Sequence, residues 1–159
     1  MLESIIASFQ SRYGVQLGPQ LGSGKDGTVL AINPTTAAKF FTSAESFFRE
    51  RDAYVVLATL GIHSVAGHAV PEMIRFDEEL KVLEMTIVRP PFLLDFASAY
   101  LLDEAPDFTD DAWDQWRVQK LEEFGDRWPE VQGVLAEFTR LSGMVLLDVN
   151  PGNIRFAEE

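Results

Sequence analysis

Three short segments of the sequence hold residues whose types and spacing could carry chemistry. In the first, residues 21–30, the pattern is formed by Gly22, Gly24, Gly27 and Val29. Glycines let backbone N–H groups approach phosphate oxygens closely, which a side chain at those positions would obstruct. A strand-like run, residues 28–32, follows the third glycine. We therefore predict a glycine flap between two strands, and the alternative is a plain hairpin with turn glycines.

The second segment pairs a lysine with a glutamate. Lys39 lies in the apolar, strand-like run 37–40, where a lysine is almost never buried without an anion. On the next predicted helix, the residues that share one face are Phe47, Glu50, Tyr54 and Leu57. This phase turns Glu50 inward and Glu45 outward, so we predict an ion pair between Lys39 and Glu50. The alternative for Glu50 is a solvated charge at the edge of the apolar stripe.

The third segment, residues 146–153, reads Leu-Leu-Asp-Val-Asn-Pro-Gly-Asn and follows a long predicted helix. Asp148 and Asn153 are five residues apart, a spacing that serves no purpose in a plain turn. We expect both side chains to line the cleft beneath the glycine flap. The alternative is a Pro-Gly turn with capping polar side chains.

Local patterns predict the elements that position these residues. Residues 2–13 have helical apolar spacing that ends at Gly14. The pattern of residues 15–41 predicts three antiparallel strands. A helix is predicted over 42–60, beginning with a capping box at Thr42. Two further strands are predicted at 70–76 and 80–88. The β-rich part, about residues 15–88, is therefore expected to form a five-stranded antiparallel sheet with one packed helix.

The second half of the chain is expected to be mainly helical. After the prolines at 90–91, residues 92–142 look helical apart from breaks near Pro106 and Pro129. Pro129 suits the first turn of a last helix that Gly143 closes. A short strand, the loop and a strand at 154–156 follow. The fold class is α+β, with a reduced helical part over about residues 92–159, in one domain spanning 1–159.

Composition narrows the function classes. At 159 residues and 47% apolar content, the chain can bury a core without disulfides. The net charge of −12 repels phosphate backbones and anionic lipid, so we expect no nucleic-acid or membrane partner. The absence of cysteine removes thiolate chemistry and suits a cytoplasmic protein. Without an apolar run of about 18 residues or a signal-like start, we expect neither a membrane span nor a secretory signal.

The order of glycine flap, strand lysine, helix glutamate, hairpin, helices and Asp-x-x-Pro-Gly-Asn loop resembles the protein-kinase-like superfamily over about residues 17–156. The sequence of this loop is similar to that of small-molecule and atypical kinases. The resemblance implies ATP and Mg²⁺ as cofactors, with Lys39 on the phosphates, Glu50 bracing the lysine, Asp148 accepting or orienting the proton of a substrate hydroxyl, and Asn153 binding the metal. It also implies that adenine is covered by Ala37 and read by the main chain of a hinge at Glu84, Met85 and Thr86.

Several residues depart from that family's pattern. Leu146 stands where the family usually has His, and Asn150 stands where protein kinases usually carry Lys. The chain ends six residues after Asn153, before the Asp-Phe-Gly segment whose Asp is the second metal ligand, and most of the C-terminal lobe is missing. Glu158 could substitute only if the tail folded back. We therefore expect weak ATP binding that depends on Lys39 and the flap, with little strengthening by Mg²⁺.

Three functions remain open at this stage. The first is a minimal kinase-like phosphotransferase acting on an unknown substrate, and the second is a nucleotide-binding pseudokinase. The third is an interaction module for a protein partner that binds no nucleotide, for which Trp113, Trp116 and Trp128 could form an interface, although aromatic residues at helical spacing are more often core.

Overall fold

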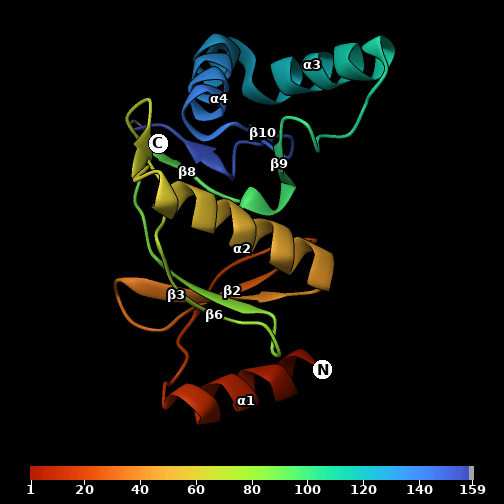
Figure 1. The fold of residues 1–159 in the computed structure, drawn as a ribbon. Coiled ribbons are helices and arrows are strands. Elements are labelled where there is room, and N and C mark those ends of the chain that lie inside the picture. The colour runs from red at the N-terminus through yellow and green to blue at the C-terminus, as the bar shows by residue number, and fades with distance from the viewer. Residues whose placement is uncertain (158–159) are drawn as a thin grey trace.

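The computed structural model describes residues 1–157, and its first half is built on a five-stranded sheet (Figure 1). The strands lie in the order β1-β2-β3-β7-β6, and every neighbouring pair is antiparallel. They are β1 (Gln20–Ser23), β2 (Gly27–Ala31), β3 (Thr36–Phe41), β6 (Met73–Asp77) and β7 (Val82–Thr86). The predicted α+β class and five-stranded sheet are confirmed.

The two faces of the sheet are covered by two different helices. On the outer face, Ala38 and Phe40 of β3 pack against Phe9 of α1 (Leu2–Tyr13). On the inner face, alternate residues of β3 point towards α2 (Ala44–Thr59). Figure 1 shows the sheet between these helices. Because side chains alternate along a strand, Lys39 lies on the inner face.

The helix α2 begins one residue later than the sequence suggested. Its N-cap is Ser43, whose hydroxyl accepts a hydrogen bond from the Ser46 N–H. The prediction that Thr42 forms the cap is therefore wrong. The Thr42 hydroxyl instead donates to the Lys25 carbonyl of the glycine flap, which ties the flap to the start of α2.

The prediction of helix from residue 92 onwards is wrong as far as residue 109, because the next helix begins only at Asp110. Residues 102–109 are turn or irregular, and the first ten residues, 92–101, are mainly extended. They form β8 (Phe92–Leu93), a 3-10 turn η1 (Phe96–Ser98) and β9 (Ala99–Leu101). β8 pairs with β11 (Ile154–Arg155) and β9 with β10 (Met144–Leu146), all antiparallel. A short apolar run does not distinguish a buried strand from a helix, and the paired residues of the partner strands lie 43 to 63 positions further along the chain.

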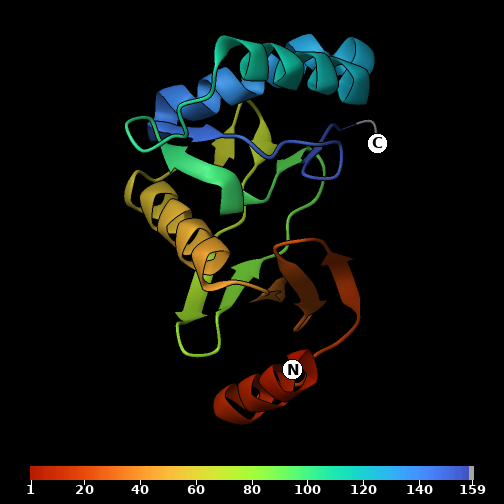
Figure 2. The ribbon, with the colours of Figure 1, turned by 90° about the vertical axis from the view of Figure 1, so that its right-hand side faces the viewer.

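The remaining elements complete the second half. A small hairpin, β4 (Ser64–Val65) and β5 (His68–Ala69), joins the β8–β11 pair. The helices are α3 (Asp110–Phe124) and α4 (Trp128–Ser142), joined by the 3-10 turn η2 (Gly125–Arg127). As predicted, α4 has proline in its first turn and ends at Gly143, whose backbone is left-handed. In Figure 2 both helices lie together at the end of the molecule opposite α1.

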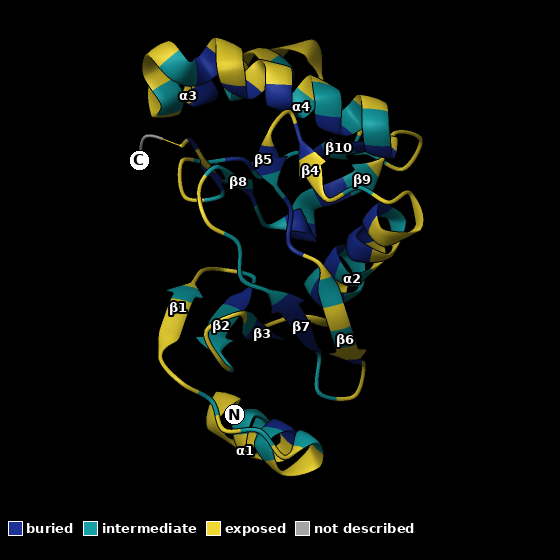
Figure 3. Cartoon of the chain, turned by 90° about the vertical axis from the view of Figure 1, so that its left-hand side faces the viewer, coloured by how far each residue is buried: buried dark blue, intermediate teal, exposed yellow. Residues whose placement is uncertain are grey.

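One apolar core connects the sheet to the helical half. Phe47 of α2, Phe96 of η1 and Phe138 of α4 are each completely buried and belong to the same cluster. Figure 3 shows this buried layer between α2 and α4. The core therefore holds α2, and with it Glu50, in a fixed position relative to the loop after β10. Over residues 1–157, no helix combines the length and apolar character needed to cross a membrane.

Candidate active site

Lys39 and Glu50 form the predicted ion pair on the inner face of the sheet. Lys39 Nζ donates to Glu50 Oε2 at 2.8 Å, and both residues are buried, with 8% and 2% of their surfaces exposed. Lys39 Nζ also lies 3.6 Å from Asp95 Oδ1. Burial opposes the charge of the lysine, but the attraction of Glu50 and Asp95 outweighs it and raises the pKa of Lys39. The two carboxylates therefore favour the charged form of the ammonium.

Asp95 is the site residue that sequence reasoning missed. It lies two residues after the end of β8 and has a left-handed backbone (φ 68°), uncommon for a non-glycine residue. Its Oδ2 accepts from Asn153 Nδ2 at 3.4 Å. Its Oδ1 is buried and has no hydrogen-bond donor among the described residues. The side chain thus lies between Lys39 and Asn153, and its buried Oδ1 faces the Lys39 ammonium.

Phe96, the residue after Asp95, contacts the helix α2. Its N–H donates to Glu50 Oε1 at 3.2 Å, so both oxygens of Glu50 are bound. Its ring packs edge-on against Tyr54 and stacks on Phe138, with centroids 5.4 and 5.8 Å away. The dipeptide Asp95-Phe96, set after a short apolar strand, was the available signal: it resembles the first two residues of Asp-Phe-Gly, but it precedes Asp148 in the chain.

The expectation that the site lacks a second carboxylate is therefore wrong. The pairing of β8 with β11 brings Asp95 beside Asn153 from 58 residues earlier in the sequence. The resemblance noted in the sequence places such a carboxylate after the loop Asn, and so it did not point to Asp95. Glu158, the substitute considered from the sequence, lies outside the described residues.

Two hydrogen bonds hold the backbone of Asp148, whereas its carboxylate accepts no hydrogen bond from the described residues. Its N–H donates to Ser98 Oγ at 2.7 Å, and its carbonyl accepts from Asn153 Nδ2 at 3.0 Å. Burial, followed by the charge of Asp95, raises the pKa of Asp148, while Lys25 and Lys120 oppose the shift. A carboxylate with a raised pKa binds a proton more readily than an ordinary aspartate, which suits a group that receives one.

Asp148 and Asp95 are joined by a third carboxylate from the glycine flap. Asp26, Asp95 and Asp148 each offer an oxygen, and these three atoms lie within 4.8 Å of one another. Ser46 donates to Asp26 at 2.9 Å. Carboxylate oxygens at this spacing repel unless a cation lies between them, and Mg²⁺ prefers oxygen ligands. The three carboxylates form a donor set of the kind that fits a divalent cation.

The flap glycines differ in what they do. At Gly27 an added Cβ would lie 2.3 Å from the Phe40 carbonyl oxygen, so glycine is required by the packing of β2 on β3. At Gly22 and Gly24 an added Cβ would meet nothing within 4 Å. Val29 packs against the inner core. Only Gly22 and Gly24 therefore leave open space of the kind that a phosphate group could use.

The residues predicted to contact adenine do not all lie on the same face of the sheet. Ala37 is buried on the inner face. The Glu84 side chain lies on the outer face and forms an ion pair with Arg75. Thr86 exchanges two hydrogen bonds with Glu72, through its own N–H and through its hydroxyl. The side chains of Glu84 and Thr86 are thus already bound within the protein, and a main-chain contact with adenine stays a prediction.

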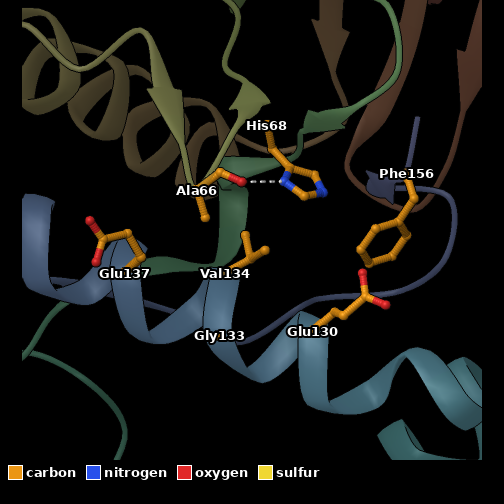
Figure 4. Close-up of a pocket in the computed structure, with 7 residues that line it drawn as sticks. All are labelled: Ala66, His68, Glu130, Gly133, Val134, Glu137 and Phe156. Carbon is orange, nitrogen blue, oxygen red and sulfur yellow. Dashed lines mark hydrogen bonds between the residues drawn. The ribbon is translucent and has the colours of Figure 1, made fainter.

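A hollow of about 410 Å³ lies away from this cleft, between α4 and the β4–β5 hairpin (Figure 4). His68 on its wall is 7% exposed, its Nδ1 lies 3.2 Å from the Ala66 carbonyl oxygen, and its ring packs edge-on against Phe156. Glu130 and Glu137 of α4 line the opposite side. None of the residues with predicted roles in the cleft lines this hollow.

Comparison with known proteins concerns the fold only. No family model matches the sequence, and no curated protein matches it. Solved structures of aminoglycoside phosphotransferases are similar at 12–13% identity. The match to the gentamicin–APH(2'')-IIa complex covers 94% of this chain and 41% of that protein, with a TM-score of 0.48. The match to ADP-bound APH(2'')-Ib covers 96% of this chain and 42% of that protein, with a TM-score of 0.46. The match to the streptomycin–ATP–APH(2'')-IIa ternary complex covers 76% of this chain and 36% of that protein, with a TM-score of 0.41. The chain spans about two fifths of the length of these proteins.

Proposed function

We propose that this protein is a protein-kinase-like phosphotransferase that binds ATP with Mg²⁺ and transfers the terminal phosphoryl group to a hydroxyl. The observation that carries the proposal is the convergence of side chains from separate segments on one cleft. The residues that meet there are Lys39, Glu50, Asp95, Asp148 and Asn153. Phosphoryl transfer depends mainly on positioning and on charge, which such a cluster provides.

Lys39 is the group proposed to hold the phosphates of the nucleotide. Its ammonium is charged and is fixed by Glu50, which is itself held by the Phe96 N–H. A pre-positioned cation loses little side-chain freedom when a phosphate binds. The open space at Gly22 and Gly24 would allow flap N–H groups to approach the same phosphates.

Asp95 and Asn153 are the proposed holders of Mg²⁺. When bound, the ion neutralises charge on the phosphates that would otherwise repel the carboxylates of this cleft. Asp148 is the proposed acceptor of the proton from the substrate hydroxyl, because its carboxylate has no hydrogen-bond donor in the described chain and its pKa is raised by burial. The presence of Asp95 changes the expectation for metal: ATP binding should now strengthen with Mg²⁺.

Calorimetric titration with ATP, with and without Mg²⁺, tests the proposal. We expect Mg²⁺-dependent binding by the wild type, which Asp95→Asn loses while still binding ATP without metal, because the variant removes a carboxylate that repels phosphate. Lys39→Ala should weaken binding in both conditions. Asp103→Asn, which changes an exposed carboxylate, is the matched control.

Transfer of labelled phosphate from ATP then separates the three functions left open by the sequence. Binding without Mg²⁺ dependence and without transfer would favour the pseudokinase. Absence of ATP binding by the wild type would favour the interaction module. Equal binding by wild type and Lys39→Ala would contradict the proposed phosphate role of the lysine.

A further inference from the structure

The helix α3 is loosely packed, yet it carries one deeply buried charge. Among its 15 residues only Lys120 is buried, and Figure 3 shows most of the helix as exposed or intermediate. Lys120 is 5% exposed, which is rare for a lysine and requires specific partners. Those partners lie in the loop that carries Asp148.

Two donors on one face of α3 bind the carbonyls of the two residues that flank Asp148. Lys120 Nζ donates to the Val149 carbonyl and lies 3.1 Å from Glu123 Oε2. One turn earlier, Trp116 Nε1–H donates to the Leu147 carbonyl at 3.1 Å. Residues four apart on a helix share a face. The carbonyls of Leu147 and Val149, the residues before and after Asp148, are therefore both fixed by α3.

The peptide groups of Asp148 itself are bound by other segments. Its N–H donates to Ser98 Oγ, and its carbonyl accepts from Asn153. The three consecutive carbonyls of residues 147–149 thus all accept side-chain hydrogen bonds. The Trp116 ring also packs against Trp128 of α4, with centroids 5.8 Å apart, so the donors of α3 are themselves held in place.

From these contacts we infer that Trp116 and Lys120 are positioning residues, which hold the loop so that the Asp148 carboxylate meets the acceptor hydroxyl. The inference rests on the proposed function of Asp148. Leu146, which stands where the kinase-like family usually has His, is buried in the core at 3% exposure and has no polar group with which to hold the loop. In this chain α3 supplies the missing support from a different element.

Steady-state kinetics of four variants test this role. Trp116→Phe keeps the ring and removes the N–H, and Lys120→Met keeps most of the stem and removes the charge. A catalytic group displaced by about 1 Å can cost about 10²-fold in rate, so we expect kcat to fall on the order of 10- to 100-fold, with KM for ATP within about two-fold of wild type. Lys120→Arg should retain most of kcat. Arg117→Met, which removes an exposed cation of the same helix, should leave both constants unchanged.

Hydrogen exchange of the indole N–H groups gives a readout that needs no activity. The Trp116 indole signal should be protected in the wild type and in Arg117→Met, and should exchange faster in Lys120→Met while thermal melting shows a folded protein. An unprotected Trp116 indole in the wild type, or equal loss of kcat in Arg117→Met and Lys120→Met, would overturn the inference. Protection that behaves as expected in a wild type without transfer activity would overturn the proposed function and leave the support of the loop by α3 in place.

Discussion

Two charged clusters lie on opposite sides of the same sheet, and their carboxylates are satisfied to very different degrees. The outer cluster is Asp77 with Arg12 and Tyr13 of α1, and the cleft cluster is Asp26, Asp95 and Asp148. On the outer face, Asp77 Oδ2 accepts from Arg12 at 2.7 Å and from Tyr13 at 2.6 Å, and its Oδ1 accepts from the Leu80 N–H at 2.9 Å. In the cleft, Asp95 Oδ1 has no hydrogen-bond donor among residues 1–157, and Asp148 faces two other carboxylates.

The pKa shifts of the two clusters point in opposite directions. Burial of Asp77 would raise its pKa, but the hydrogen bonds from Tyr13, Leu80 and Arg12 outweigh burial and lower it. Burial and the charge of Asp95 raise the pKa of Asp148. The outer cluster therefore stabilises the docking of α1, whereas the cleft keeps charges that destabilise the folded protein in the absence of a cation. Unfavourable charge retained at one place is typical of a functional site.

The largest expected difference is in the transfer reaction. Asp148→Asn should lower the rate of phosphoryl transfer by about 10²- to 10⁴-fold, the usual contribution of a general base, and should leave ATP binding in place. Asp77→Asn, the matched change on the outer face, should leave transfer unchanged at a temperature where the protein is folded. Similar losses of transfer in both variants would show that the two clusters do not differ in function.

The second expected difference is in stability. Asp77→Ala leaves the Tyr13 hydroxyl and the Leu80 N–H without their acceptor, so the free energy of unfolding should fall by about 1–3 kcal/mol. Urea denaturation measures this change. The exposed control Asp103→Ala should lie within about 0.5 kcal/mol of wild type. A loss at Asp77 no greater than that of the control would mean that the outer cluster does not hold α1.

The part of the cleft that lies on the inner face of the sheet was predictable from the local periodicity of one strand and one helix. The alternation of β3 and the helical phase of α2 were enough to pair Lys39 with Glu50. The Asp95–Asn153 contact was not predictable in this way, because it depends on pairing β8 with β11 and on a chain order that differs from the kinase-like family. Lys120 was missed for a related reason: its partner, the Val149 carbonyl, is a main-chain group 29 residues away, and no side-chain pattern marks it.

The smallest and most discriminating prediction is the pH dependence of stability in metal-free buffer. A carboxyl with a lowered folded-state pKa contributes stability above its unfolded pKa, about 3.9 for aspartate, and this contribution is lost as pH falls through the folded value. The stability advantage of wild type over Asp77→Asn should therefore shrink below about pH 4.

Asp148 should show the opposite sign. Its raised folded-state pKa means that the folded protein binds the proton more tightly than the unfolded chain, so the ionised carboxylate destabilises the protein above that pKa. Asp148→Asn should be more stable than wild type at neutral pH, and the difference should disappear as acid protonates Asp148. Urea midpoints from pH 3 to pH 7 for both variants measure the two slopes. Slopes of the same sign would contradict the contrast between a satisfied outer carboxylate and an unsatisfied one in the cleft.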